Sequence, residues 1–211
     1  MSFTYLRDPK LIYQESFATI RRETDLSALA ADEAAMATRV IHACGMPDIV
    51  PDLVFGGAVA DATRKALTSG QSIFTDVEMV RHGLRRSAMP AECEVSCTLN
   101  DPQTLKLANE LATTRSAAAV HFWHEKLAGA VVIIGNAPTA LFALLELIDR
   151  GAPRPAALFA FPVGFVGAIE AKAELIRDPR GLAFATLAGR RGGSAIAAAA
   201  FNAVLDGAGE Q

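Results

Sequence analysis

One histidine stands where the end of a helix would favour a proton donor. His42 lies in residues 39–45, a segment of helical periodicity that closes on Gly45, a residue typical of the left-handed position after a helix. The negative end of a helix stabilises an imidazolium by about 0.3–1 kcal/mol, so His42 could act as a general acid. A histidine that only caps the helix would occupy the same position, and position alone does not separate the two interpretations.

Three glycine-rich turns each join a predicted strand to a predicted helix, at residues 134–139, 161–165 and 189–194. Amides at a helix N-terminus bind carboxylates and phosphates, and parallel strands would gather the turns at one edge of a sheet. We therefore expect free amides there, although glycine and proline also make tight turns without any ligand. The residues expected to contact an anion are Gly135, Asn136, Pro138, Thr139, Gly164, Arg190, Gly192, Gly193 and Ser194, with Arg191 as a second guanidinium.

The common nucleotide-binding patterns are absent. Neither G-x-G-x-x-G nor G-x-x-x-x-G-K-[ST] occurs in the 211 residues. A formal net charge of −3, with no basic run interleaved with aromatic residues, gives no general attraction for nucleic acid. We therefore expect an anionic ligand with several carboxylates, captured by local groups.

Other polar residues are candidates for ligand contact, and each has an ordinary structural alternative. Tyr13 and Ser16 lie at helical spacing in the first predicted helix, where general exposure statistics favour a serine that simply faces solvent. Arg115 and Lys172 are single cations of the kind that is usually solvated.

Metal binding and covalent catalysis have little support in the sequence. His121 and His124 resemble half of a metal site without the other half. Cys93 and Cys97 would lie about 13 Å apart on a strand, too far to share one zinc, and Cys44 would point away from His42. We expect no metal and no disulfide.

The elements that must position these residues alternate along the chain. Helical periodicity over residues 9–22 and 27–44 predicts an N-terminal helical extension. Short apolar runs then alternate with amphipathic stretches, which predicts an α/β fold with a mostly parallel sheet flanked by helices. The expected strands are residues 53–55, 72–74, 94–98, 130–134, 157–160 and 184–187; the expected helices are 59–67, 102–115, 138–150, 166–177 and 194–205.

Composition limits the class of protein. Hydrophobic residues make up 51% and charged residues 20% of the chain, which is typical of a globular protein, and a single domain over residues 1–211 is expected. No apolar run reaches the length of a membrane span, and the first residues lack the features of a signal peptide. We expect a cytoplasmic protein with neither a membrane nor a nucleic acid as partner.

The order of these segments resembles the precorrin-8X methylmutase family, which also has a cobalt-precorrin-8 form. The resemblance covers nearly the whole chain, and the segments at 135–141 and 162–166 are its most specific parts. The other matching positions are Ser16, Phe17, Arg39, residues 41–43, Thr114, Arg115, residues 132–134, Lys172 and residues 189–194.

The resemblance implies an isomerase of cobalamin biosynthesis. It would move a methyl group from C-11 to C-12 of a corrinoid, converting precorrin-8X to hydrogenobyrinic acid, with His42 as proton donor and no redox cofactor. Tyr13, Ser16, Arg39, Arg115, Lys172 and the three turns would bind substrate in a homodimer whose site lies near the subunit boundary.

The sequence also departs from the family pattern in places, and it leaves alternatives open. Ala171 stands where a serine is common, Leu84 and Arg85 stand where a hydroxyl residue often contacts substrate, and Cys44 follows the histidine less typically. A non-catalytic corrinoid carrier would use the same pocket. A nucleotide-binding oxidoreductase of the same fold class is the other alternative.

Overall fold

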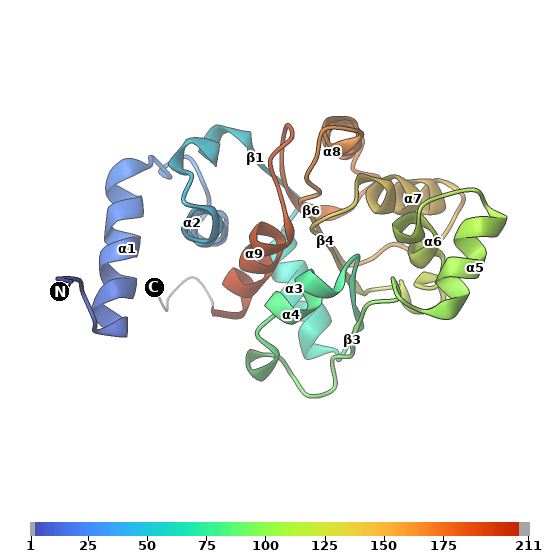
Figure 1. Cartoon of the computed structure of the whole chain (residues 1–211), viewed down its shortest axis with the longest axis horizontal. Helices are drawn as coiled ribbons and strands as arrows, with labels where there is room; N and C mark the ends of the chain where they lie inside the picture. The colour runs from blue at the N-terminus through green and yellow to red at the C-terminus, as the bar shows by residue number, and fades with distance from the viewer. Residues whose placement is uncertain (1–2, 207–211) are drawn as a thin grey trace.

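A six-stranded sheet forms the centre of the molecule. The computed structural model describes residues 3–206 (Figure 1). The strands lie in the order β1-β6-β5-β4-β2-β3, and β1 is antiparallel to β6 while the other pairs are parallel. The predicted α/β fold with a mostly parallel sheet is thereby confirmed. The strands are β1 (Leu53–Gly56), β2 (Ile73–Thr75), β3 (Val95–Ser96), β4 (Val131–Ile134), β5 (Ala157–Ala160) and β6 (Ala183–Leu187).

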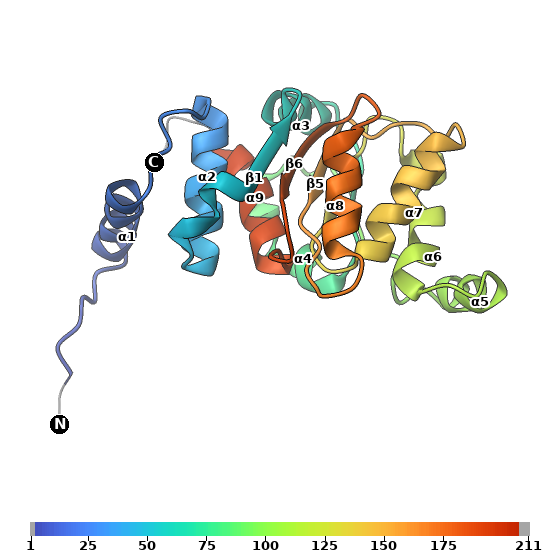
Figure 2. The ribbon, with the colours of Figure 1, turned by 90° about the horizontal axis from the view of Figure 1, so that it is seen from above.

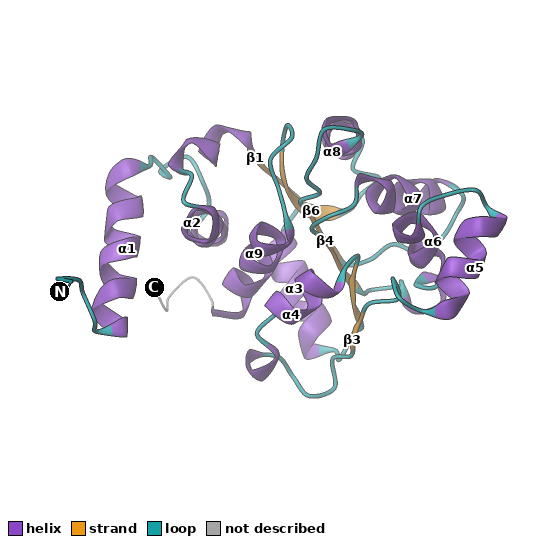
Figure 3. Ribbon diagram, viewed as in Figure 1, coloured by secondary structure: helices purple, strands orange, loops and turns teal. Residues whose placement is uncertain are grey.

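Helices cover both faces of this sheet, as Figures 2 and 3 show. Among residues 3–206, no helix is both long and apolar enough to cross a membrane. The α-helices are α1 (Pro9–Glu23), α2 (Ala31–Cys44), α3 (Val59–Thr68), α4 (Glu78–Gly83), α5 (Pro102–Glu110), α6 (Arg115–His121), α7 (Pro138–Asp149), α8 (Ala168–Arg177) and α9 (Ser194–Asp206), and the 3-10 turns are η1 (Pro47–Asp52), η2 (Arg86–Ala88) and η3 (His124–Lys126).

Alternation along the central strands builds a separate core on each face. In β4, Val131 and Ile133 pack into the core formed with α2, α3 and α9, whereas Val132 and Ile134 pack into the core formed with α6, α7 and α8. All four side chains are fully buried. A strand buried on both faces needs the continuous apolar run that the sequence has here, because successive side chains point to opposite faces.

Two predicted helices differ from the structure by more than two residues at one end. The stretch 102–115 is broken, because Ala112 adopts a left-handed φ of 49° and the hydroxyl of Thr114 then caps a new helix, α6, by accepting the amide of Ala117. The second helix begins at Ala31 instead of residue 27, where Glu33 accepts the amide of Ala30 at 3.0 Å. Gly45, with φ of 67°, ends this helix in the predicted left-handed conformation.

Helix α1 is a peripheral extension, as predicted, whereas α2, the second helix of the predicted extension, packs against α9 in the core. Helix α1 packs against α2 at the opposite end of the molecule from α5 (Figure 1). Asp8 caps its N-terminus, and only Phe17 and Ile20 are buried. Much of the apolar surface on and before α1 therefore stays exposed within one chain.

The chain reverses its direction across the sheet between β2 and β4. From β2 the chain runs through α4 to the outer strand β3, and it then returns through α5 and α6 to β4. Helices α4 and α6 consequently lie on opposite faces. The carboxyl ends of β2 and β4 form a topological switch point, which is where open α/β sheets commonly bind ligands.

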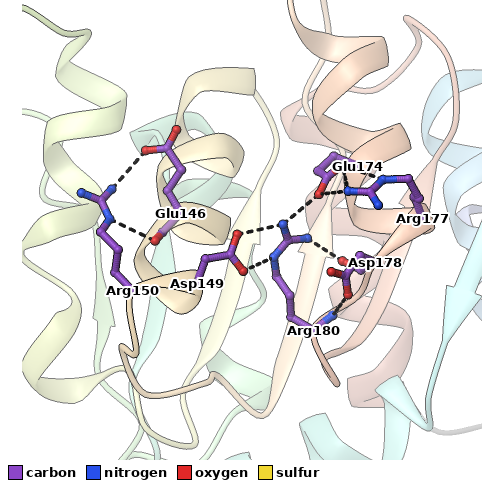
Figure 4. Close-up of polar contacts among 7 residues, drawn as sticks. All are labelled: Glu146, Asp149, Arg150, Glu174, Arg177, Asp178 and Arg180. Atoms are coloured by element: carbon purple, nitrogen blue, oxygen red, sulfur yellow. Dashed lines mark hydrogen bonds and ion pairs between the residues drawn. The ribbon is translucent and has the colours of Figure 1, made fainter.

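An ion-pair network joins the C-terminal ends of α7 and α8 (Figure 4). The Arg180 guanidinium donates to both carboxylate oxygens of Asp149, at 2.7 and 2.9 Å, and to Glu174 at 2.8 Å. Its side chain is only 10% exposed. This network lies at the C-terminal ends of both helices, at the edge of the sheet away from the glycine-rich turns, so its role is to hold the two helix ends together.

Candidate functional site

A hydrogen bond between α1 and α2 fixes the candidate acid. Ser16 Oγ lies 2.8 Å from His42 Nδ1. The imidazole packs against the rings of Tyr13 and Phe17, with centroid separations of 5.3 and 5.2 Å, while His42 as a residue remains exposed. Ser16 therefore does not simply face solvent, and the contact leaves Nε2 as the nitrogen of His42 that is available to a ligand.

A shallow groove of about 420 Å³ surrounds this pair. Apolar side chains of α1 and α2 form much of its surface, and two acids, Glu15 and Glu23, lie at its border. Glu15 is partly neutralised by Arg22 at 3.4 Å. The complete lining is Leu6, Ile12, Glu15, Ser16, Thr19, Ile20, Glu23, Ile41, His42, Gly45 and Pro47.

A second groove, of about 570 Å³, lies beside the same aromatic cluster and is cationic. Lys10, Arg21 and Arg39 line it together with Tyr13 and Phe17. Arg39 donates to the hydroxyl of Tyr13 and forms an ion pair with Asp206. Its Nε is buried without a hydrogen-bond partner within residues 3–206. The two predicted site residues Tyr13 and Arg39 are therefore in direct contact, and the fold has left one donor of Arg39 unsatisfied.

The three glycine-rich turns are brought together at one edge of the sheet. A Cβ on Gly135 would lie 2.8 Å from the Cα of Ser194, so the first turn packs on the third. A Cβ on Gly192 would lie 2.3 Å from the carbonyl oxygen of Phe161, so the third turn packs on the second. Glycine is required at both positions because backbone approaches backbone there.

The prediction of free amides is wrong for one glycine in each turn. Gly164 donates its amide to the carbonyl of Arg190 at 3.2 Å, and Gly193 donates to that of Phe161 at 2.8 Å. Gly135 donates to Asp76 Oδ1 at 2.9 Å. Tight packing among the turns engages these groups internally, because a buried amide without a partner would be costly. Contact of these glycines with substrate remains a prediction.

The two neighbouring arginines of the third turn have different surroundings. Arg191 donates to Asp48 at 2.6 Å and Asp52 at 2.7 Å, both in η1, so its guanidinium does not serve as the free second fork that was predicted. Arg190 is exposed, and its guanidinium lies 5.6 Å from the ring centroid of Phe165. Arg190 is thus the guanidinium of this turn that is open to an anion.

Lys172 lies beneath the same turn, fully buried. Its Nζ donates to the carbonyl of Arg191 at 2.6 Å. Burial lowers the pKa of Lys172 to about 8. The solvated alternative is wrong for this residue, and its visible role is to hold the turn; a direct contact with substrate remains a prediction.

Helices α6 and α7 begin side by side. Thr114, the N-cap of α6, and Thr139, in the first turn of α7, place their Oγ1 atoms 2.8 Å apart. Pro138 opens α7, where the missing amide proton costs nothing. The predicted contacts Arg115 and Asn136 flank this pair and are exposed.

The turns do not line the groove that holds His42 within one chain. Segment η1 lies between them: Pro47 borders the groove, and Asp48 and Asp52 bind Arg191 of the third turn. The histidine and the turns are therefore linked through one short segment, but they do not share a cavity of a single chain.

The residues that depart from the family pattern lie mostly in packed surroundings. Ala171 is fully buried, and Leu84 is 7% exposed. Arg85 forms an ion pair with Asp206 and donates from its backbone to Asn202 at 3.0 Å. Cys44 is half-buried, and burial raises the pKa of its thiol. Across the described range 3–206, no three His, Cys, Asp or Glu residues cluster to hold a metal.

Comparison with known proteins gives a consistent family. A family model described as Precorrin-8X methylmutase matches residues 11–207. A precorrin-8X methylmutase of Pseudomonas aeruginosa is 54% identical, with 95% of this chain and 96% of that protein covered. A cobalt-precorrin-8 methylmutase of Priestia megaterium is 32% identical, with 93% and 87% covered.

A solved structure shares the same fold. The precorrin-8X methyl mutase of Thermus thermophilus superposes with a TM-score of 0.83 at 35% identity, covering 94% of this chain and 96% of that one. Sequence and structure thus agree over nearly the full length, and a family of methylmutases disfavours the oxidoreductase alternative. This chain belongs to the precorrin-8X methylmutase family, whose members are isomerases of cobalamin biosynthesis.

Proposed function

We propose that this chain isomerises precorrin-8X to hydrogenobyrinic acid by moving a methyl group from C-11 to C-12 of the corrinoid. The bond from the methyl carbon to C-11 breaks as the bond to C-12 forms, so no electrons are gained or lost. A proton delivered to the macrocycle is balanced by one released from the rearranged product. The observation that carries the proposal is the Ser16–His42 hydrogen bond in an open groove of a methylmutase fold.

His42 is the proposed proton donor. It lies in the last turn of α2, at the negative end of the helix, and Ser16 holds Nδ1 so that the ring presents Nε2 outward. The rings of Tyr13 and Phe17 restrict the imidazole from the side. A general acid held in one orientation typically contributes about 10²–10⁴-fold to a rate.

Substrate carboxylates are the proposed partners of the exposed cations. Lys10 and Arg21 in the cationic groove, and Arg115 and Arg190 near the turns, form no ion pair with any acid of the described segment. The three guanidinium groups bind carboxylates in a bidentate manner, and the ammonium group of Lys10 attracts them as a point charge. These four side chains are therefore better candidates for anion capture than the engaged amides of the turns.

A homodimer would complete the site. Apolar side chains on and before α1 are exposed, among them Tyr5 at 64%, Leu11 at 49% and Ile12 at 44%. The groove at His42 is shallow, and the clustered turns lie outside it. We propose that a second copy covers α1 and brings further substrate contacts to His42, which light scattering would test as a dimeric mass that Leu11→Glu lowers to that of a monomer.

The proposed natural substrate is the metal-free corrinoid. Relatives named for precorrin-8X, from Pseudomonas aeruginosa and a Sinorhizobium species, are 54% and 51% identical, whereas the cobalt-precorrin-8 methylmutase of Priestia megaterium is 32% identical. A higher kcat/KM with precorrin-8X than with its cobalt form would support this, and the reverse order would contradict it. The proposed place of action is the cytoplasm.

His42→Ala tests the reaction directly. We expect the rate of methyl migration to fall by about 10²–10⁴-fold while hydrogenobyrinic acid still binds, because the acid is removed and the cations remain. The matched control is His82→Ala at the end of α4, an exposed histidine whose Nδ1 lies 2.8 Å from the carbonyl oxygen of Glu78 and 3.6 Å from the carboxylate of the same residue. The control should turn over at the normal rate.

The same assay separates the alternatives. An unimpaired His42→Ala rate would remove the proposed acid. Corrinoid binding by the wild-type chain without turnover between about pH 5 and 9 would favour the carrier function instead.

A further inference from the structure

A buried carboxylate occupies the switch point of the sheet. Asp76 follows β2 directly, and its backbone amide donates to the carbonyl of Ile133 in β4 at 3.2 Å. Its side chain is 1% exposed. The carboxylate thus lies between the carboxyl ends of β2 and β4, the place where an open α/β sheet would ordinarily receive a ligand.

The Asp76 carboxylate accepts three backbone amides at the start of α7. Gly135 donates to Oδ1 at 2.9 Å, and Asn136 and Ala137 donate to Oδ2 at 2.9 and 2.8 Å. Burial raises the pKa of Asp76, and these three hydrogen bonds oppose that effect. Three converging N–H groups at a positive helix end match an ionised, acceptor-only group, since a protonated oxygen would face a donor.

The turn held by Asp76 carries two of the predicted substrate contacts, Asn136 and Thr139. Asn136 is exposed, and Thr139 contacts Thr114, which caps the helix that begins with Arg115. A displacement of the turn would therefore move the side chains of both helix starts together. Asp76 itself touches none of the surface that a substrate can reach.

We propose that Asp76 is a positioning residue: it fills the anion site at the N-terminus of α7 with the protein's own carboxylate, thereby fixing Asn136, Thr139 and Arg115 and directing substrate carboxylates to side chains. The proposal rests on the proposed methylmutase function for its effect on turnover. Its structural part, an internal anion site, stands independently of that function.

The test replaces the carboxylate and then supplies one. Asp76→Asn keeps the shape but presents an NH₂ group to an amide, and Asp76→Ala leaves an empty anion site. Both variants should raise KM for precorrin-8X by about 10-fold or more, because a shift of the turn by about 1 Å would misplace the side chains that bind substrate. Both should change kcat by less than about 3-fold. Sodium formate should return KM of Asp76→Ala toward the wild-type value, whereas sodium chloride at equal ionic strength should not.

Asp101→Ala is the matched control for a merely structural cap. Asp101 caps α5 by accepting the amide of Gln103 at 2.8 Å, and within the described residues it makes no hydrogen bond to the three turns. Its loss should lower the melting temperature without changing KM. If both Asp76 variants likewise lost only thermal stability, with KM unchanged below the transition, the proposal would be overturned.

The melting temperature, which needs no turnover, separates the positioning role of Asp76 from the proposed methylmutase function. Formate should raise the melting temperature of Asp76→Ala but not that of the wild type; equal effects of formate and chloride on the variant would refute an anion site. Failure of the wild type to convert precorrin-8X would instead count against the proposed function. If Asp76→Ala does not fold, Thr139→Val, which breaks the hydroxyl contact with Thr114, should raise KM in the same way, and an unchanged KM would contradict the positioning role.

Discussion

Replacing Lys172 with methionine should alter how stability depends on pH. Lys172 is fully buried under the third turn, and its only hydrogen bond within the described chain goes to the carbonyl of Arg191. Burial lowers its pKa from 10.5 to about 8. Methionine has a similar length and no charge, so the variant removes the titration while filling most of the space.

The sign of the effect follows from proton binding. Below pH 8 the lysine is charged in both the folded and the unfolded chain, and the folded state bears the full cost of burying that charge. Between pH 8 and 10.5 the unfolded chain binds more protons, so the free energy of unfolding of the wild type rises with pH. The lowered pKa corresponds to a change of about 3 kcal/mol over this interval.

In Lys172→Met, the free energy of unfolding should lack most of this rise with pH. At pH 7 it avoids the cost of a buried charge but leaves the carbonyl of Arg191 without its donor, at about 1–3 kcal/mol, so the two proteins should differ little. At pH 10.5 the wild type should be the more stable protein, because its neutral amine still donates. Titrations of tyrosines and thiols occur in both proteins and cancel in the difference.

Urea unfolding at several pH values from about 7 to 10.5 measures this difference directly. Lys106→Met, at a lysine whose side chain is 79% exposed, is the matched control and should give a difference from wild type that stays flat with pH. A flat difference for Lys172→Met as well would refute the reasoning, because it would mean that the amine does not become neutral ahead of the unfolded chain.

Two further substitutions test the packing that positions the site. Arg180→Ala should lower the melting temperature by about 3–6 °C, since it breaks a partly buried network, whereas Arg150→Ala, at a side chain 63% exposed, should lower it by less than about 2 °C in the same thermal scan. Gly135→Ala should lower the free energy of unfolding by about 1–3 kcal/mol, because its Cβ would lie 2.7 Å from Val80; a urea titration showing no loss would contradict that packing.

The fold was predictable wherever one local signal dominated. The run Val131–Ile134 has apolar side chains at every position, as a strand buried on both faces requires. The antiparallel direction of β1 was not predictable, because a short apolar strand has the same composition in either direction. The break in the stretch 102–115 was not predicted, because helical periodicity outweighed the capping signal of Thr114.

The candidate site was predictable only in its local parts. His42 could be placed from Gly45 and the helix pattern that precedes it, and Ser16 from helical spacing. Asp76 was missed because its partners lie 59 to 61 residues further along the chain. Its signal was an acidic residue directly after a strand, and the adjacency of β2 and β4 that gives this residue its role is set by topology, which no local pattern encodes.

The distribution of charge around the turns argues that anion capture depends on side chains. Asp76 accepts the amides at the start of α7, and Asp48 and Asp52 bind the guanidinium of Arg191, so carboxylates of the protein already occupy these two anion-binding groups. Arg190, in the same turn, makes no ion pair within the described residues and is exposed. A rigid turn with one free guanidinium binds carboxylates more selectively than a set of open amides does, because the planar guanidinium recognises a carboxylate by geometry as well as by charge. If the proposed substrate contacts hold, rigidity and recognition belong to adjacent residues of one segment, with Arg191 and Lys172 holding the turn that presents Arg190.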